Sequence, residues 1–407
     1  MVRVGLVQHQ NLVLDKCWFV VRIKGLIMKK VFICVVLLFA VVSLSAQMTV
    51  SGILDSTVAF NAGAADSPNF SYGIEEYANI RFQSRLRDSK GAVHGAVNLI
   101  AASGDYAANA ALMAGYASLA APVGFNSTPY VAGQNFISAI ELERLFFRLR
   151  GEHVDFDGGL MRLPFGYGQV WGPSDFLNPR NPLKPDARPR AILGGAFTWY
   201  PIDELKLLGF YASPRDAFSN EGNGSFFGFS MDRHWENSSV QTLYSFEIPK
   251  TGSANGIHRI GLSLKADIEI GFVMETLYTY NHEAGTDLNG LSFSVGADYS
   301  FADGNLMVLT EYLYNGHESS TAFNLESNIL GQQNTHNIYA GITWRINDFT
   351  SLNSALIASF DSISYVPFVS LNHELFQGAT LTVSVQVPFD NDDFYGVACT
   401  ARIRIRF

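Results

Sequence analysis

The chain has 407 residues, of which 48% are hydrophobic and 16% are charged, and its formal net charge is -9 at pH 7. An acidic protein of this size lacks the positive surface that nucleic-acid binding needs, so we expect no nucleic-acid partner. Its cysteines are Cys17, Cys34 and Cys399. Because the first two fall in the predicted presequence, the mature chain can form neither an internal disulfide nor a cysteine-based metal site.

The N-terminal region has the three parts of a secretory signal peptide. A charged start at Met28 precedes an apolar run over 31–42, and small residues follow up to Ala46. The run is shorter than the roughly 20 residues that a membrane-spanning helix needs, and an uncleaved anchor is the alternative. We predict an upstream extension from a mis-assigned start (1–27), a signal peptide cleaved after Ala46 (28–46) and a β-barrel (47–407).

From Met48 onward, apolar and polar residues alternate over segments of roughly ten to fourteen residues, separated by turn residues. Side chains on a strand point to opposite faces with period 2, so each segment has one apolar and one polar face. This contrast is typical of a wall between lipid and water. We predict an all-β fold, a transmembrane antiparallel β-barrel of about 18 strands (range 16–18). The predicted strands are 48–60, 77–87, 92–103, 139–150, 153–163, 195–201, 204–213, 225–232, 238–248, 257–269, 271–281, 291–302, 305–315, 336–346, 350–360, 363–375, 379–388 and 394–407.

The last strand shows the two faces most clearly, because Ile403 and Ile405 alternate with Arg402, Arg404 and Arg406. Turning an arginine toward the middle of the lipid would cost about 2 to 4 kcal/mol, so the arginines are predicted to face the lumen. The predicted pore-lining residues are Arg81, Arg85, Arg144, Arg148, Asp155, Asp157, Arg402 and Arg404. Further carboxylates predicted to face the lumen are Asp55, Asp267, Glu275, Asp298 and Glu311. The arginines gather on the arc of the last and first four strands, which predicts a weak preference for anions.

The connections between predicted strands alternate in length. Those after even-numbered strands are tight, as at 151–152 and 303–304, whereas 164–194 and 316–335 are long. Short periplasmic turns and long external loops are the outer-membrane pattern. Outward aromatic residues near both strand ends predict two girdles at the membrane surfaces. An alanine-rich part of another long loop, 107–121, suits a short helix over the mouth or a mobile surface loop.

The connection 164–190 differs from the other connections because it is rich in proline and in aromatic residues. Its six prolines prevent it from pairing as a strand, and its aromatic residues Phe165, Trp171 and Phe176 need burial. Water above a barrel does not provide that burial. We therefore predict that this loop folds into the lumen and packs on the wall.

In position and composition, this loop resembles the constriction loop of classical porins. Its motif Trp171-Gly172-x-x-Asp175-x-x-Asn178-Pro179 is similar to one in porin-like and export-type outer-membrane barrels. The resemblance implies that the loop narrows a channel and contacts solute; alternatively, the motif is a packing plug in which Asp175 and Asn178 cap turns. The candidate constriction residues are Trp171, Asp175, Asn178, Arg180, Lys184, Asp186, Arg188 and Arg190.

The end of the chain, from Tyr395 to Phe407, resembles the C-terminal signal that outer-membrane barrels present to their assembly machinery. The resemblance implies that this machinery is a partner and that Phe407 is part of the signal. It also implies an integral protein surrounded by outer-membrane lipid, with the long loops at the cell surface.

No catalytic constellation is present: the sequence has no H-E-x-x-H, Walker or G-x-S-x-G motif, and its histidines are scattered. We therefore predict no enzyme, no cofactor and no metal. The leading hypothesis is a porin-like channel for passive diffusion of small polar or anionic solutes. The alternatives are a barrel that exports or binds an anionic polysaccharide and a surface adhesin or antigen that uses the barrel as a scaffold.

Overall fold

A computed structural model describes residues 47–63, 70–85, 90–104, 130–132, 136–178, 191–213, 224–248, 256–281, 290–316, 336–360, 364–390, 393–394 and 396–407. The predicted targeting region, 1–46, and the alanine-rich segment, 107–121, lie outside the described residues. Tyr395, the predicted start of the terminal signal, lies outside them as well.

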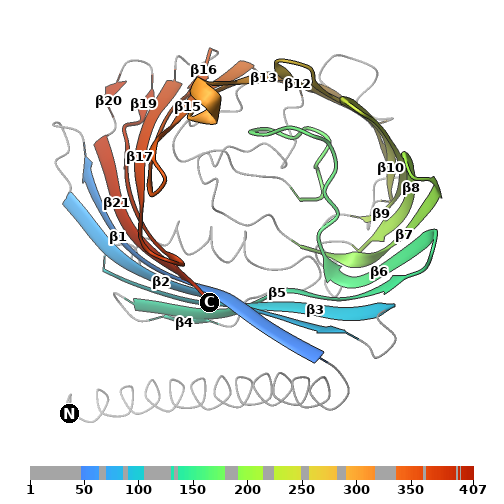
Figure 1. The fold of residues 1–407 in the computed structure, drawn as a ribbon, viewed down its shortest axis with the longest axis horizontal. Coiled ribbons are helices and arrows are strands. Elements are labelled where there is room, and N and C mark those ends of the chain that lie inside the picture. Colours follow the sequence, from blue (N-terminus) through green and yellow to red (C-terminus); the bar gives the residue numbers. More distant parts are fainter. Residues whose placement is uncertain are drawn as a thin grey trace, which may run out of the picture.

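Eighteen antiparallel strands in the described part of the chain form one closed ring (Figure 1). Closure is direct, because β1 pairs with β2 on one side and with β21 on the other. The strands of the ring are β1 (Gln47–Gly63), β2 (Phe70–Arg85), β3 (Gly91–Gly104), β5 (Phe136–Arg150), β6 (Val154–Met161), β7 (Ile192–Ile202), β8 (Leu205–Ala212), β9 (Ser225–Trp235), β10 (Ser238–Ile248), β11 (Ile257–Asp267), β12 (Gly271–Asn281), β13 (Leu291–Phe301), β14 (Leu306–Asn315), β15 (His336–Asn347), β16 (Thr350–Ser359), β17 (Ser364–Phe376), β18 (Ala379–Gln386) and β21 (Gly396–Arg406). Short pieces add to this ring: β4 (Tyr130–Ala132), β19 (Phe389–Asp390), β20 (Asp393–Phe394) and the 3-10 turn η2 (Ala302–Gly304).

The predicted barrel and its strand count are confirmed, and most boundaries agree within a few residues. The largest difference is in β2, which begins at Phe70 rather than at 77. There the ladder with β1 continues up to the pair Ala62–Phe70. Phe70, Tyr72 and Ile74 are exposed at alternate positions, so the two-faced pattern is present in this part of the strand and only the consecutive acidic residues Glu75 and Glu76 interrupt it before 77.

Tight turns lie at one rim of the ring, which we call the turn rim; examples are 203–204, 236–237 and 348–349. The opposite end of the ring, the loop rim, has the longer connections, such as those after β8 and β14. This arrangement follows from an antiparallel ring, in which every second connection meets the same rim. No helix among the described residues is long and apolar enough to cross a membrane.

The outer surface of the ring is apolar. In β9, for example, Phe227, Phe229 and Met231 are exposed at alternate positions, and in β21 Ile403 and Ile405 are exposed in the same way. In a soluble protein such side chains would be buried, so their exposure around the ring marks a surface that lipid covers.

One irregularity changes which side chains of β5 face inward. Arg144 pairs with Ala96 and Leu142 pairs with Val97, so Glu143 is an extra residue in the ladder between β3 and β5. Such a β-bulge shifts the phase of alternation and re-aims a side chain. As a result the consecutive residues Glu143 and Arg144 both face the lumen, which strict alternation does not predict.

Candidate functional site

The segment that follows β6, 162–178, leaves the wall and runs inside the barrel (Figure 1). It first follows the inner faces of β9 and β10. There the Gly166 backbone N–H donates to Gln241 Oε1 (2.6 Å), and the Tyr167 hydroxyl donates to Asp232 Oδ1 (2.5 Å). Burial, and then the hydrogen bond to Asp232, raise the pKa of Tyr167 above its ordinary value, so the phenol is a donor at neutral pH.

Glu275 on β12 is a fully buried carboxylate that binds the backbone of this loop. Its Oε1 accepts hydrogen bonds from the N–H groups of Tyr167 and Gly168, and its Oε2 accepts one from Ser174 at 3.3 Å. Gly166 has a φ of +80°, and a Cβ on it would collide with the Glu275 carboxylate. Glycine is therefore the residue that lets the backbone come this close.

Glu311 on β14 binds the tip of the loop in the same way and is 1% exposed. It accepts the backbone N–H groups of Gln169 (3.2 Å), Val170 (3.0 Å) and Trp171 (2.8 Å). These buried N–H groups need acceptors, and the carboxylate supplies strong ones. The carboxylate equally needs the donors, because an uncompensated buried charge costs several kcal/mol.

Apolar packing fixes the loop tip against the far wall. The Trp171 side chain is 2% exposed and packs with Leu313, Ile357 and Val366 on β14, β16 and β17. Its ring meets that of Tyr339 on β15 edge to face, with centroids 6.5 Å apart. In the ring of strands, β14 to β17 lie nearly opposite β6, so the loop reaches across the barrel.

The base of the loop packs on the nearer wall. Phe165 and Leu177 form a buried cluster with Phe210 on β8, Phe226 on β9 and Leu243 on β10. These inward positions of the wall are apolar, in contrast to those of a water-filled lumen. The loop therefore fills the space beside β7 to β10 with side chains.

The polar residues of the predicted motif close the loop on itself. Asn178 Oδ1 accepts the backbone N–H of Leu163 (2.8 Å), and Asp175 Oδ1 accepts that of Phe165 (3.4 Å). Asp175 and Asn178 are 3% and 1% exposed. Asp175 and Asn178 are buried within the loop and Trp171 is buried between the loop and the wall, so none of the three is exposed to contact a passing solute. The other candidate constriction residues, Arg180, Lys184, Asp186, Arg188 and Arg190, lie outside the described residues.

On the opposite arc, lumen arginines are paired with carboxylates. Arg404 on β21 makes two hydrogen bonds of 2.7 Å to Asp55 on β1, and Arg148 on β5 binds Asp157 on β6 at 2.7 and 2.8 Å. In each pair, the arginine and the aspartate are directly opposite each other in the strand register. The first pair lies at the seam that closes the ring.

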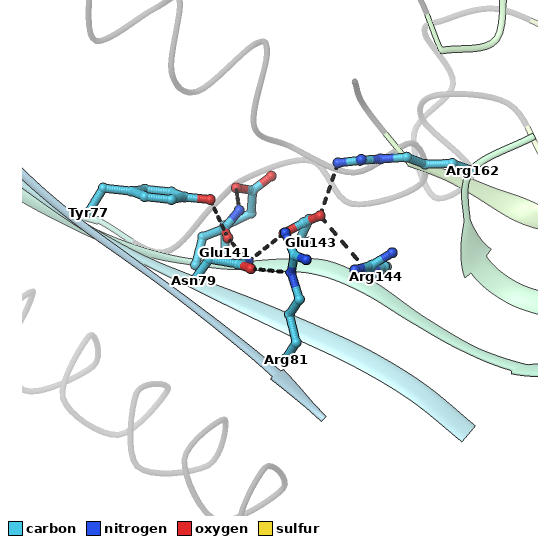
Figure 2. Close-up of polar contacts among 8 residues, drawn as sticks. Tyr77, Asn79, Arg81, Glu141, Glu143, Arg144 and Arg162 are labelled. Atoms are coloured by element: carbon cyan, nitrogen blue, oxygen red, sulfur yellow. Dashed lines mark hydrogen bonds and ion pairs between the residues drawn. The ribbon is translucent and has the colours of Figure 1, made fainter. Parts of the chain in front are cut away.

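A polar network centred on Glu143 occupies the inner face of β2, β3 and β5 (Figure 2). The buried Glu143 carboxylate accepts hydrogen bonds from Asn79 (2.5 Å) and Arg162 (3.0 Å), and Arg144 lies 4.0 Å away. Arg81 donates to Asn79 Oδ1 at 2.7 Å. Because Arg162 is the first residue after β6, this network ties the start of the loop to the arginine-rich arc.

The remaining predicted pore-lining residues lie on the same arc. Asp155 stands opposite Arg150 in the register of β5 and β6, Arg402 stands opposite Thr382, and Arg85 is exposed at the turn-rim end of β2. Among the described residues, no group of three or more His, Cys, Asp or Glu side chains could hold a metal ion.

The alternation pattern places Glu275 and Glu311 on the inner face but does not show that they hold the loop. A signal was available in the neighbouring strands, where the inward residues Ser263, Ser292 and Ser294 are small. All three are buried in the structure. Small inward residues in a wide barrel leave room for another segment, and a carboxylate among them indicates a segment that offers hydrogen-bond donors.

The fold can be compared with solved structures. Acinetobacter baumannii OccAB1 superposes with a TM-score of 0.57 at 10% identity, over 88% of this chain and 96% of that chain. The outer membrane protein opdK of Pseudomonas aeruginosa gives 0.54 at 9% identity, over 89% and 98%, and OccK8 (OprE) of the same organism gives 0.53 at 10% identity, also over 89% and 98%. The fold is that of an outer-membrane porin. At such low identity, the likeness concerns the fold alone.

Two comparisons were made with the sequence, and neither found a match. No family model matches the chain. No curated protein matches it either.

Proposed function

We propose that this protein is an integral outer-membrane channel for passive diffusion of small polar or anionic solutes, and that the loop 162–178 limits its width. The observation that carries the proposal is the attachment of this loop to the inside of the wall by two buried carboxylates, Glu275 and Glu311. A wide barrel leaves an aqueous lumen unless something fills it. A segment fixed across that lumen sets the size of what can pass.

The loop rim faces outward from the cell and the turn rim faces the periplasm, as the loop lengths indicate. The signal peptide 28–46 directs export, and the terminal Phe407 takes part in recognition by the barrel assembly machinery. Arg148 and Arg404 are engaged by carboxylates of the wall, which makes these two arginines less available to an anionic polysaccharide.

Planar-bilayer recording tests the proposal. The purified wild-type barrel should give steady ohmic openings, and deletion of 168–188 should increase the single-channel conductance about twofold or more, because the pore of a barrel this wide is set by what fills it. A heat-modifiability gel verifies that the deleted form still folds. An unchanged conductance in a folded deletion variant would refute the constriction, and a wild type without any current would refute the channel.

A further inference from the structure

A continuous row of uncharged polar side chains crosses the inner wall from β15 to β21. The strand register places its members directly opposite one another on five successive strands. The row consists of Thr343, Asn353, Ser370, Ser384 and Thr400. We call it the hydroxyl row.

The neighbours of these residues along each strand show that the row faces the lumen. Trp344 on β15, Val369 on β17 and Val383 on β18 are exposed to the outside. With period 2, the residues next to them point inward. The members of the row are partly exposed apart from the buried Ser370, so their polar groups line the lumen.

Hydrogen bonds connect neighbouring members of the row, but they do not use all the donor and acceptor sites of these side chains. The Thr343 hydroxyl donates to Asn353 Oδ1 (2.9 Å), and Asn353 Nδ2 lies 3.4 Å from Ser370 Oγ. The hydroxyls of Ser384 and Thr400 are 2.5 Å apart. A hydroxyl has one donor and two acceptor sites, and a primary amide has two donors and two acceptor sites. Several donor and acceptor positions therefore remain for a ligand.

The row also has an aromatic neighbour. Phe368 lies two residues from Ser370 on β17, at the next inward position toward the loop rim. It is opposite Ala355 and Gln386 in the strand register. It shares the inward face of its strand with Ser370 and is partly exposed. An apolar ring beside a few oriented polar groups is the usual composition of a site for a small polar organic molecule.

The position of the row relates it to the loop. On β16, Asn353 lies four residues from Ile357, against which Trp171 packs. At about 3.3 Å per residue, the row begins about 13 Å closer to the turn rim than the loop tip. With neighbouring strands about 4.8 Å apart, its five members span about 19 Å of the wall. A solute that has passed the loop tip meets the row next.

We propose that the hydroxyl row is a binding track for neutral polyhydroxylated solutes of the size of a sugar. This inference rests on the channel function proposed above and adds its substrate class. Hydroxyl and amide groups can exchange hydrogen bonds with the hydroxyls of such a solute without the desolvation of a charge. Phe368 offers an apolar surface to the carbon face of the ring. No member of the row is itself charged; Arg402 is the next inward residue of β21 after Thr400, toward the turn rim.

Proteoliposome swelling tests the track with glucose, gluconate and triethylene glycol as probes. Triethylene glycol is small and neutral and has fewer hydroxyl groups than glucose. For the wild type, glucose should enter at least as fast as gluconate. In the variant Thr343→Val, Asn353→Leu and Thr400→Val, glucose entry relative to triethylene glycol should fall about tenfold, as the loss of one or two hydrogen bonds implies.

The matched control is Ser354→Ala, because Ser354 is next to Asn353 but faces outward from β16. It should leave the ratio of glucose to triethylene glycol unchanged. The inference is overturned if gluconate enters the wild type much faster than glucose, or if the triple variant slows both neutral probes equally while its barrel is folded on a heat-modifiability gel. If the wild type conducts ions, either of these results refutes the binding track alone. A wild type without conductance refutes the channel function.

Discussion

Inward carboxylates have different roles on the two sides of the barrel. On the loop-covered side, Glu275 and Glu311 are buried and accept backbone N–H groups of the loop. On the opposite side, Asp55 and Asp157 pair with arginines of adjacent strands. All four occupy the same kind of position, an inward residue of a wall strand. The role of a lumen carboxylate is therefore decided by what lies over it.

The largest expected effect comes from removing the loop anchors. The double variant Glu275→Ala and Glu311→Ala leaves the N–H groups of Tyr167, Gly168 and 169–171 without these acceptors. We expect the loop to lose roughly 3 to 6 kcal/mol of docking free energy and to detach from the wall. Single-channel conductance should then rise toward that of the 168–188 deletion.

The matched control for the anchors is Asp298→Ala on β13. Asp298 accepts one side-chain hydrogen bond from Gln169 (2.8 Å) and holds no backbone group of the loop in the described contacts. Its removal should change conductance little. If the double variant conducts like the control, the carboxylates do not hold the loop.

The ion pair at the seam should matter more for stability than for conductance. Asp55→Ala leaves Arg404, whose side chain is 18% exposed, without its bidentate partner. Breaking a pair buried to this degree costs about 3 kcal/mol, so the temperature at which the folded band disappears from a heat-modifiability gel should fall. Asp157→Ala serves for comparison, because its partner Arg148 is 33% exposed and water can replace the lost contact more easily. An equal decrease in the two variants would show that burial of the pair is not the cause.

Charge reversal on the arginine-rich arc should change ion selectivity. Arg81 and Arg144 belong to the network of Figure 2, in which the buried carboxylate of Glu143 is already satisfied by Asn79 and Arg162. We expect the wild type to be weakly anion-preferring and the variant Arg81→Glu plus Arg144→Glu to shift the reversal potential in a salt gradient toward cations. A wild type that is already cation-selective would end this prediction.

The smallest effect is expected from Tyr167→Phe, which removes one hydrogen bond to Asp232 and should cost the loop about 1 to 2 kcal/mol. Current noise should increase slightly while mean conductance stays the same. Because the pKa of Tyr167 is raised above its ordinary value of 10.0, the contribution of the neutral phenol is complete below pH 10.0 and is lost only as the pH rises through the higher value. A noise increase in the wild type between pH 7 and pH 10.0 would contradict this assignment.

The sequence alone was sufficient to predict the strands that form the wall of the barrel. Alternation with period 2 indicates which side chains meet lipid and which meet the lumen wherever a strand has no bulge; in β21, Ile405 is exposed on the outer surface and Arg404 is paired with Asp55. It also located the strands, because each strand shows its own pattern without reference to any other. The prolines and aromatic residues of 164–190 predicted a loop that enters the lumen, and the described residues 164–178 do so.

Only the tertiary structure decided how that loop is held. Tyr167 and its acceptor Glu275 are 108 positions apart, and Trp171 and Glu311 are 140 apart. Periodicity shows that Glu275 points into the barrel but not what lies across from it. The bulge at Glu143 likewise depends on the pairing of β5 with β3, so its effect on Arg144 cannot be seen in β5 by itself. In a strand without a bulge, the local pattern determines the face of a side chain, whereas its partner depends on the path of the chain through the space enclosed by the ring.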